Sequence, residues 1–211
     1  MKKSDKKLLM MIGIVVACFA LFFAAKFIFS SRDGVVTIDE LHRMNIQGKA
    51  GDPHYVHNGF SFVKSENLWY TRVKVKDSLI DIPLHFGPKE LEDIQVRGSI
   101  DDNFKKSHIY ITFNPLGEGM QYVALSSAEL SLNLAKGLEI IPVAACDRNE
   151  TYACEDRPIK TCDSEDAVIY MQESNETEVV LQGNCVMIRG AGWDLVRATD
   201  RLLLQWYGVM N

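Results

Sequence analysis

The sequence predicts an α+β protein: an N-terminal transmembrane helix, then an antiparallel β-rich domain with a disulfide-stapled loop and a C-terminal amphipathic helix. Three observations predict this class. An uncharged apolar segment lies near the N-terminus, apolar and polar residues alternate from residue 60 onward, and the C-terminus has helical periodicity. The expected parts are a cytoplasmic tail (1–7), a transmembrane signal anchor (8–29), a tether (30–36) and an extracytoplasmic α+β domain (37–211).

The anchor prediction depends on the run LLMMIGIVVACFALFFAA, residues 8–25, which has no charge and follows four lysines. Spanning a bilayer takes about 20 apolar residues. Lys26 interrupts the run, but a lysine near a helix end can reach the headgroups. Because lysine-rich flanks stay in the cytoplasm, we expect a single-pass protein of the cell membrane. Its N-terminus would be cytoplasmic, residues 8–29 would contact the lipid bilayer, and the C-terminal domain would lie outside.

Two alternatives for this segment stay open. The first is cleavage as a signal peptide, although no A-x-A site follows the apolar run. The second is lipidation of Cys18, because Val15-Val16-Ala17-Cys18 is similar to a bacterial lipobox.

The composition excludes one class of partner. Apolar residues make up 47% and charged residues 24% of the chain, which is typical of a globular protein. The net charge is -5, and no long basic run follows the first seven residues. Because phosphate binding needs clustered positive charge, we expect no nucleic-acid partner.

The first part of the domain, 37–115, is predicted to be a β-meander after one short helix. Thr37 and Glu40 fit a capping box for a helix over 38–45. Alternating residues predict antiparallel strands at 60–64, 68–76, 79–86, 94–100 and 108–114. Pro83 lacks an N–H and therefore places its strand at an edge or a bulge.

The second part, 116–211, is predicted to be an αβ unit. It begins with a short strand at 122–125, a helix from Ser126 or Ser127 to Lys136, and a buried strand at 138–145. After the cysteine-rich loop, three strands are expected, at 167–173, 178–182 and 185–190. The first two are expected to form a hairpin around the polar SNET segment.

The C-terminal helix begins after Gly190-Ala191-Gly192, a close strand-to-helix turn. Its apolar stripe, which we expect to pack on the sheet, consists of Leu195, Thr199, Leu202 and Trp206. The opposite, polar side consists of Asp194, Arg197, Asp200, Arg201 and Gln205.

The disulfide prediction rests on four cysteines beyond the anchor, Cys146, Cys154, Cys162 and Cys185. Outside the cytoplasm paired thiols oxidise, and four cysteines make two disulfides in one of three connectivities, which the sequence does not choose. A metal site would need closely spaced ligand pairs such as C-x2-C, which are absent. Free or redox-active thiols are the remaining alternative.

Asn149 and Asn175 each begin an N-x-T triplet in a polar stretch, which makes both candidate N-glycosylation sites. His54-x-x-His57, with His85, could form a three-nitrogen metal site, but turn-forming residues flank the pair and favour ordinary loop histidines. We therefore assign no catalytic residue, no cofactor and no metal ligand.

Several stretches resemble a group of membrane-anchored archaeal proteins from small genomes, whose activity is not known. They are HNGFSFVKSENLWYTRV, IPLHFGPKELEDI, AACDRNETYACEDRPIKTC and the ending NCVMIRGAGWDLVRATDRLLLQWYGVM. The resemblance covers most of the chain outside the anchor. It implies an archaeal cell surface, which favours the two glycosylation sites over lipidation.

The leading functional hypothesis is therefore a non-enzymatic cell-surface protein, structural or binding, with a protein partner at the cell surface. Trp69 and Tyr70 are the candidate partner surface. The alternative is an extracytoplasmic hydrolase whose carboxylates and histidines converge only in the fold. Convergence of His54, His57 or His85 with acidic residues in a deep cleft would favour the enzyme. An extracytoplasmic sensor is a third option, disfavoured because seven cytoplasmic residues hold no output domain.

Overall fold

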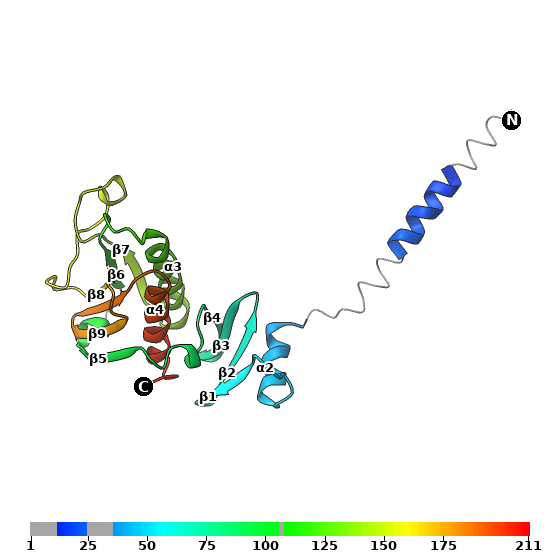
Figure 1. Cartoon of the computed structure of the whole chain (residues 1–211), viewed down its shortest axis with the longest axis horizontal. Helices are drawn as coiled ribbons and strands as arrows, with labels where there is room; N and C mark the ends of the chain where they lie inside the picture. The colour runs from blue at the N-terminus through cyan, green and yellow to red at the C-terminus, as the bar shows by residue number, and fades with distance from the viewer. Residues whose placement is uncertain (1–11, 25–35, 106–107) are drawn as a thin grey trace. The chain divides into compact units, whose positions relative to one another are not determined.

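The computed structural model describes residues 12–24, 36–105 and 108–211. The chain divides into two compact units, Met1–Thr37 and Ile38–Asn211. Every strand of the described residues belongs to the second unit (Figure 1). This unit is α+β, with one antiparallel and one mixed sheet, so that part of the prediction is confirmed.

The predicted transmembrane anchor is wrong. Among the helices of the described residues, none is both long enough and apolar enough to cross a membrane. The described helix in this region covers residues 12–24. Residues 8–11 and 25–29 of the predicted anchor lie outside the described residues, as do the tail 1–7 and most of the tether 30–36.

This result also contradicts the predictions of topology and localisation that depended on the anchor. The fold class with a transmembrane helix, the single-pass topology and the localisation to the cell membrane are not supported. The same holds for the assignment of the C-terminal domain to the outside, because that assignment came from the orientation of the anchor.

The smaller sheet is a four-stranded antiparallel meander in the order β1-β2-β3-β4. Its strands are β1 (Tyr55–His57), β2 (Phe60–Ser65), β3 (Leu68–Val75) and β4 (Ser78–Leu84). Pro83 lies in β4, which pairs only with β3 and is an edge strand, as its missing N–H predicts.

Both faces of the smaller sheet are covered. Helix α2 (Ile38–Ile46) lies on one face, where His42 and Asn45 bond the hydroxyl of Ser61 at 2.9 and 2.8 Å. The opposite face carries large apolar side chains into the main core, namely Phe62, Trp69, Ile82 and Leu84. Trp69, predicted to be an exposed partner residue, is only 5% exposed, and its indole donates to Glu90 at 2.6 Å. Tyr70, on the α2 side, is half-buried.

The larger sheet has six strands in the order β5-β9-β10-β8-β6-β7. They are β5 (Gln95–Ile100), β6 (His108–Phe113), β7 (Ile141–Ala144), β8 (Val168–Glu173), β9 (Glu178–Gly183) and β10 (Cys185–Gly190). All neighbours pair in parallel except β9 and β10.

This topology differs from the prediction in two respects. Strands β5 and β6 were expected to continue the antiparallel meander, but both join the larger sheet and pair with parallel neighbours. The expected β8–β9 hairpin is also wrong, because β10 lies between the two and forms the hairpin with β9. Alternating residues indicate that a segment is a strand, but its neighbour is chosen by tertiary packing.

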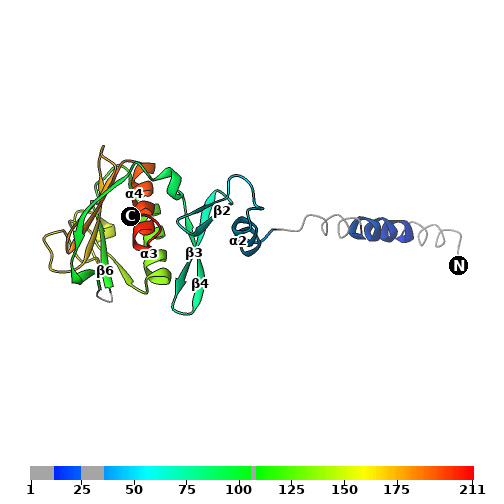
Figure 2. The same ribbon diagram turned by 90° about the horizontal axis from the view of Figure 1, so that it is seen from below.

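Two helices, α3 (Met120–Gly137) and α4 (Trp193–Trp206), lie side by side between the sheets (Figures 1 and 2). The predicted strand at 122–125 and the helix start at Ser126 or Ser127 are wrong, since α3 begins before them. Val123, Leu130 and Leu134 are buried at helical spacing, and this stripe outweighs the local strand preference of Tyr122-Val123.

Helix α4 is buried on more than one side. The predicted apolar stripe packs in the core, but Asp200 and Arg201, expected on the polar side, are 0% and 5% exposed. The reason is the layer order, because the helix contacts the larger sheet on one side and the segment after β4 on the other. The turn that leads from β10 into α4 is tight, because a Cβ on Gly190 would lie 2.6 Å from the backbone of Asp194.

Candidate functional site

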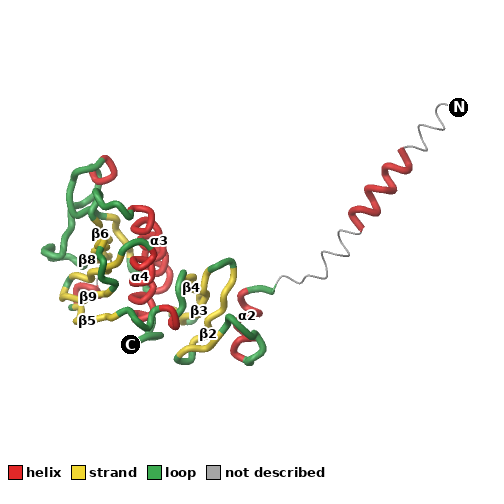
Figure 3. Tube along the Cα trace, viewed as in Figure 1, coloured by secondary structure: helices red, strands yellow, loops and turns green. Residues whose placement is uncertain are grey.

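The cysteine-rich loop between β7 and β8 contains little regular structure apart from η3 (Tyr152–Cys154) (Figure 3). Two disulfides hold it, Cys146–Cys154 and Cys162–Cys185. The first closes the loop on itself, and the second ties it to the start of β10. The sequence left three connectivities open, and this is one of them.

Two backbone hydrogen bonds also fix the chain around the first disulfide. Cys146 donates its N–H to the carbonyl of Pro158, and Lys160 donates to the carbonyl of Cys146, at 3.1 and 2.9 Å. Arg157 therefore lies between the disulfide at Cys154 and this two-hydrogen-bond bridge. Its backbone N–H also donates to the Cys154 carbonyl at 3.2 Å. Although the loop is exposed, the base of the Arg157 side chain has a defined position.

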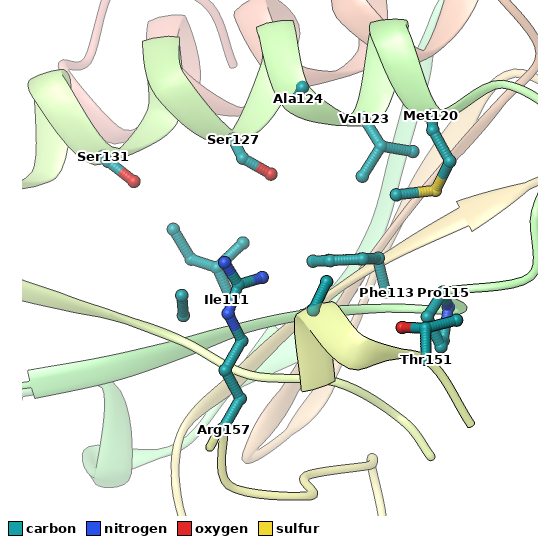
Figure 4. A pocket seen from close by; sticks show the side chains of 12 residues that line it. Ile111, Phe113, Pro115, Met120, Val123, Ala124, Ser127, Ser131, Thr151 and Arg157 are labelled. Carbon is teal, nitrogen blue, oxygen red and sulfur yellow. The ribbon is translucent and has the colours of Figure 1, made fainter. Parts of the chain in front are cut away.

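This loop forms one wall of a cavity that we call the α3 groove, of about 480 Å³. The volume is within the range of roughly 300–1,000 Å³ that is typical of small-molecule sites. Its other walls are one face of α3 and the strands β6 and β7 (Figure 4). The lining side chains are Ile111, Phe113, Pro115, Met120, Val123, Ala124, Ser127, Ser131, Ala144, Thr151, Ala153 and Arg157.

The groove is mostly apolar, with a few polar groups at defined places. Arg157 extends its guanidinium into it, opposite Ser127 and Ser131 of α3 (Figure 4). Within the described part of the chain, no carboxylate forms an ion pair with Arg157, whereas Arg148 of the same loop pairs with Asp147 at 2.9 Å. The Thr151 hydroxyl is buried and has no hydrogen-bond partner among the described residues.

A second cluster lies where β4 ends, between α3 and α4. The Nδ1 atom of His85 lies 2.8 Å from Oε2 of Glu129, and the backbone N–H of His85 donates to Oε1 at 3.2 Å. Asp200 accepts the N–H of Phe86 at 2.8 Å through Oδ2. One ligand atom from each of His85, Glu129 and Asp200 lies within 4.8 Å of the others.

The two carboxyl groups are unusual for their burial. Glu129 is 8% exposed and Asp200 is not exposed at all. Burial, and after it the charge of Glu129, raises the pKa of the Asp200 carboxyl well above its usual range. The hydrogen bond to Glu129 raises the pKa of His85, against the effect of its partial burial.

The remaining sequence-predicted residues do not converge. His54 accepts the backbone N–H of Lys64 at 3.0 Å and so supports the β-hairpin, and it belongs to no cluster with His57 or His85 in the described residues. Asn149 and Asn175 are exposed on loops, and their glycosylation stays a prediction. Sequence reasoning missed Arg157, Glu129 and the role of Asp200, because no local pattern marks them.

Comparison with known proteins gives no relative. No protein-family model, no curated protein and no solved structure matches the chain. Membership of the archaeal group that the sequence resembles therefore stays a prediction, and function has to be inferred from the geometry.

Proposed function

We propose that this protein is a non-enzymatic binding domain whose ligand is a small amphipathic anion, a carboxylate with an aliphatic body, held in the α3 groove. The observation that carries the proposal is the exposed guanidinium of Arg157, which forms no ion pair among the described residues and extends into a mostly apolar cavity of about 480 Å³. An arginine fork matches a carboxylate in geometry as well as in charge.

The apolar lining supports the aliphatic part of this ligand. Phe113 of β6 and Met120 and Val123 of α3 line the groove, and burying a methylene group contributes about 0.8 kcal/mol. The hydroxyls of Ser131 and Thr151 add hydrogen-bonding groups to the walls of the groove. The disulfide-closed loop supports pre-organisation, because less of the wall has to be ordered on binding.

Calorimetric titration of the full chain with decanoate, with 1-decanol as the uncharged analogue, tests the proposal. We expect decanoate to bind more tightly. Arg157→Gln should weaken the binding of decanoate by about 5- to 30-fold and leave the binding of decanol unchanged. This factor corresponds to the loss of a charged hydrogen bond of about 1–2 kcal/mol.

The matched control is Arg148→Gln, because Arg148 is on the same loop but already paired with Asp147 and does not line the groove. Equal loss of decanoate binding in both variants would mean that general surface charge, not Arg157, attracts the ligand. No binding of either compound to the wild type would refute the proposal.

A hydrolase is the second candidate, and one observation favours it. His85 converges with Glu129 and Asp200, beside a cavity of about 200 Å³ that His85 and Glu129 line. A panel of chromogenic esters tests it, with His85→Gln as the variant. Turnover that persists in His85→Gln would exclude this cluster as its source.

A further inference from the structure

We propose that His85, Glu129 and Asp200 form a binding site for one divalent transition-metal ion, with Zn²⁺ the best-matched. The proposal does not depend on ligand binding in the α3 groove. Its three residues come from three elements, the end of β4, the middle of α3 and the middle of α4.

Uncompensated charge is the first reason. Two carboxyl groups, 8% and 0% exposed, lie together. The described residues contain no lysine or arginine that forms an ion pair with either of them, and among these residues only His85, when protonated, pairs with Glu129 as a cation. Buried carboxylates without a compensating charge are strongly unfavourable, so such a pair needs either a shared proton or a bound cation.

An unsatisfied atom is the second reason. Oδ1 of Asp200 is fully buried and receives no hydrogen bond from an N–H or O–H of the described residues, while Oδ2 already accepts the Phe86 N–H. The Glu129 carboxyl lies within hydrogen-bonding reach of Asp200 when one of the two is protonated. A buried lone pair costs free energy unless something binds it, and either a proton shared with Glu129 or a cation between Asp200, Glu129 and His85 would do so.

The donor set points to the class of ion. One imidazole and two carboxylates suit zinc, which takes three protein ligands at about 2.0–2.2 Å and a fourth from water in open sites. Ca²⁺ and Mg²⁺ prefer oxygen ligands, so the imidazole of His85 favours zinc over both of them. In tetrahedral zinc the ligand atoms lie roughly 3.3 Å apart. The Nδ1–Oε2 distance of 2.8 Å between His85 and Glu129 is that of a hydrogen bond, so the two atoms would move apart by about 0.5 Å when a zinc ion replaces the shared hydrogen.

The cluster is accessible from one side. His85 has a side-chain exposure of 24%, and together with Glu129 it lines a cavity of about 200 Å³ whose other walls are apolar. These walls are Leu68, Pro83, Leu125, Ala128 and Leu132. An ion can reach His85 and Glu129 from this cavity.

The test uses the full chain with its disulfides intact and Cys18→Ala as background, so that this exposed thiol does not bind metal. Calorimetric titration with Zn²⁺ should give one site per chain. Co²⁺ should give the visible d–d absorption of a four-coordinate site. Asp200→Asn should weaken Zn²⁺ binding by more than about 100-fold, since loss of a direct ligand exceeds the 10- to 100-fold effect of outer-shell changes.

Asp200→Asn also separates the two explanations of the carboxyl pair. Its amide oxygen can still accept the Phe86 N–H, and its amide group can donate to Glu129, so the hydrogen-bonded pair survives without the metal ligand. Thermal unfolding without metal checks that this variant folds. If it does not fold, Glu129→Gln and His85→Gln serve the same purpose.

His57→Gln is the control, because His57 lies outside the cluster. Retained binding in this control and loss in the cluster variants supports the site. Two outcomes overturn the proposal. One is a wild type that takes up no Zn²⁺, which leaves a shared proton as the compensation. The other is binding lost in His57→Gln and kept in Asp200→Asn, which assigns it to surface histidines.

Discussion

The two disulfides should stabilise the fold to different extents, and the difference can be calculated from the loops they close. The sequence separations are 8 residues for Cys146–Cys154 and 23 for Cys162–Cys185. Closing a loop of n residues removes about 2.1 + 1.5R ln n cal/mol/K from the unfolded chain. At 25 °C this gives about 2.5 kcal/mol for the first bridge and about 3.4 kcal/mol for the second.

The stabilisation by each disulfide can be measured by reducing that disulfide in a variant that lacks the other one. In Cys162→Ala/Cys185→Ala only the first bridge remains, and in Cys146→Ala/Cys154→Ala only the second. Both carry Cys18→Ala. Because oxidised and reduced forms of one variant share the same side chains, the cavities left by alanine cancel.

Urea unfolding followed by tryptophan fluorescence measures both forms. We expect reduction to lower the free energy of unfolding by about 2.5 kcal/mol in the first variant and about 3.4 kcal/mol in the second. The corresponding fall in Tm is roughly 2–4 °C per kcal/mol for a chain of this size. A reversed order, or losses under about 1 kcal/mol in both, would refute the loop-closure reasoning.

Three further predictions concern the core and the buried cluster. Gly190→Ala should lower the free energy of unfolding by about 2–4 kcal/mol in urea unfolding, because its Cβ would lie 2.6 Å from the Asp194 backbone; a loss under about 1 kcal/mol would mean that α4 shifts freely. Leu202→Ala should cost about 2–5 kcal/mol by the same measurement, since the side chain is fully buried in α4, and a smaller loss would contradict its place in the core. In the metal-free protein, the stability contributed by His85 and Asp200 should rise as the pH falls from about 8 to about 6, whereas His42, whose pKa is lowered by burial, acts in the opposite direction. The pKa of His85 is raised in the folded protein. Its contribution to stability is therefore complete below the pKa of the unfolded state and is lost as the pH rises through the pKa of the folded state. The raised pKa of Asp200 acts in the same direction. Thermal unfolding across this range checks it, and the slope should flatten in His85→Gln.

Much of the local structure could be predicted from the sequence. Alternation marks β2 and β3, and a 3.6-residue period marks α4. Pro83 predicts an edge strand or a bulge, because a residue without an N–H cannot serve a regular central strand, and β4 is an edge strand. Each of these conclusions depends on neighbours within a few positions of the chain.

The rest depends on contacts between distant segments, which no local pattern encodes. The insertion of β10 between β8 and β9 is one case. The burial of Asp200 is another, since a polar residue on a helix normally faces solvent, and only the second layer against α4 buries it. The cluster with His85 and Glu129 likewise exists only once three separate elements meet.

The anchor prediction came from the hydropathy of residues 8–29 alone. Among the residues that the structure describes, no helix is both long and apolar enough to cross a membrane.

Proline sits on an outer strand of each sheet, Pro83 in β4 and Pro142 in β7. These strands also carry the exposed apolar residues Leu79 and Ile141, at 66% and 62%. Free strand edges with apolar side chains tend to recruit strands from other molecules. A ring nitrogen without hydrogen leaves a gap in the row of donors that an incoming strand would need, so we expect both borders to resist self-association at high concentration.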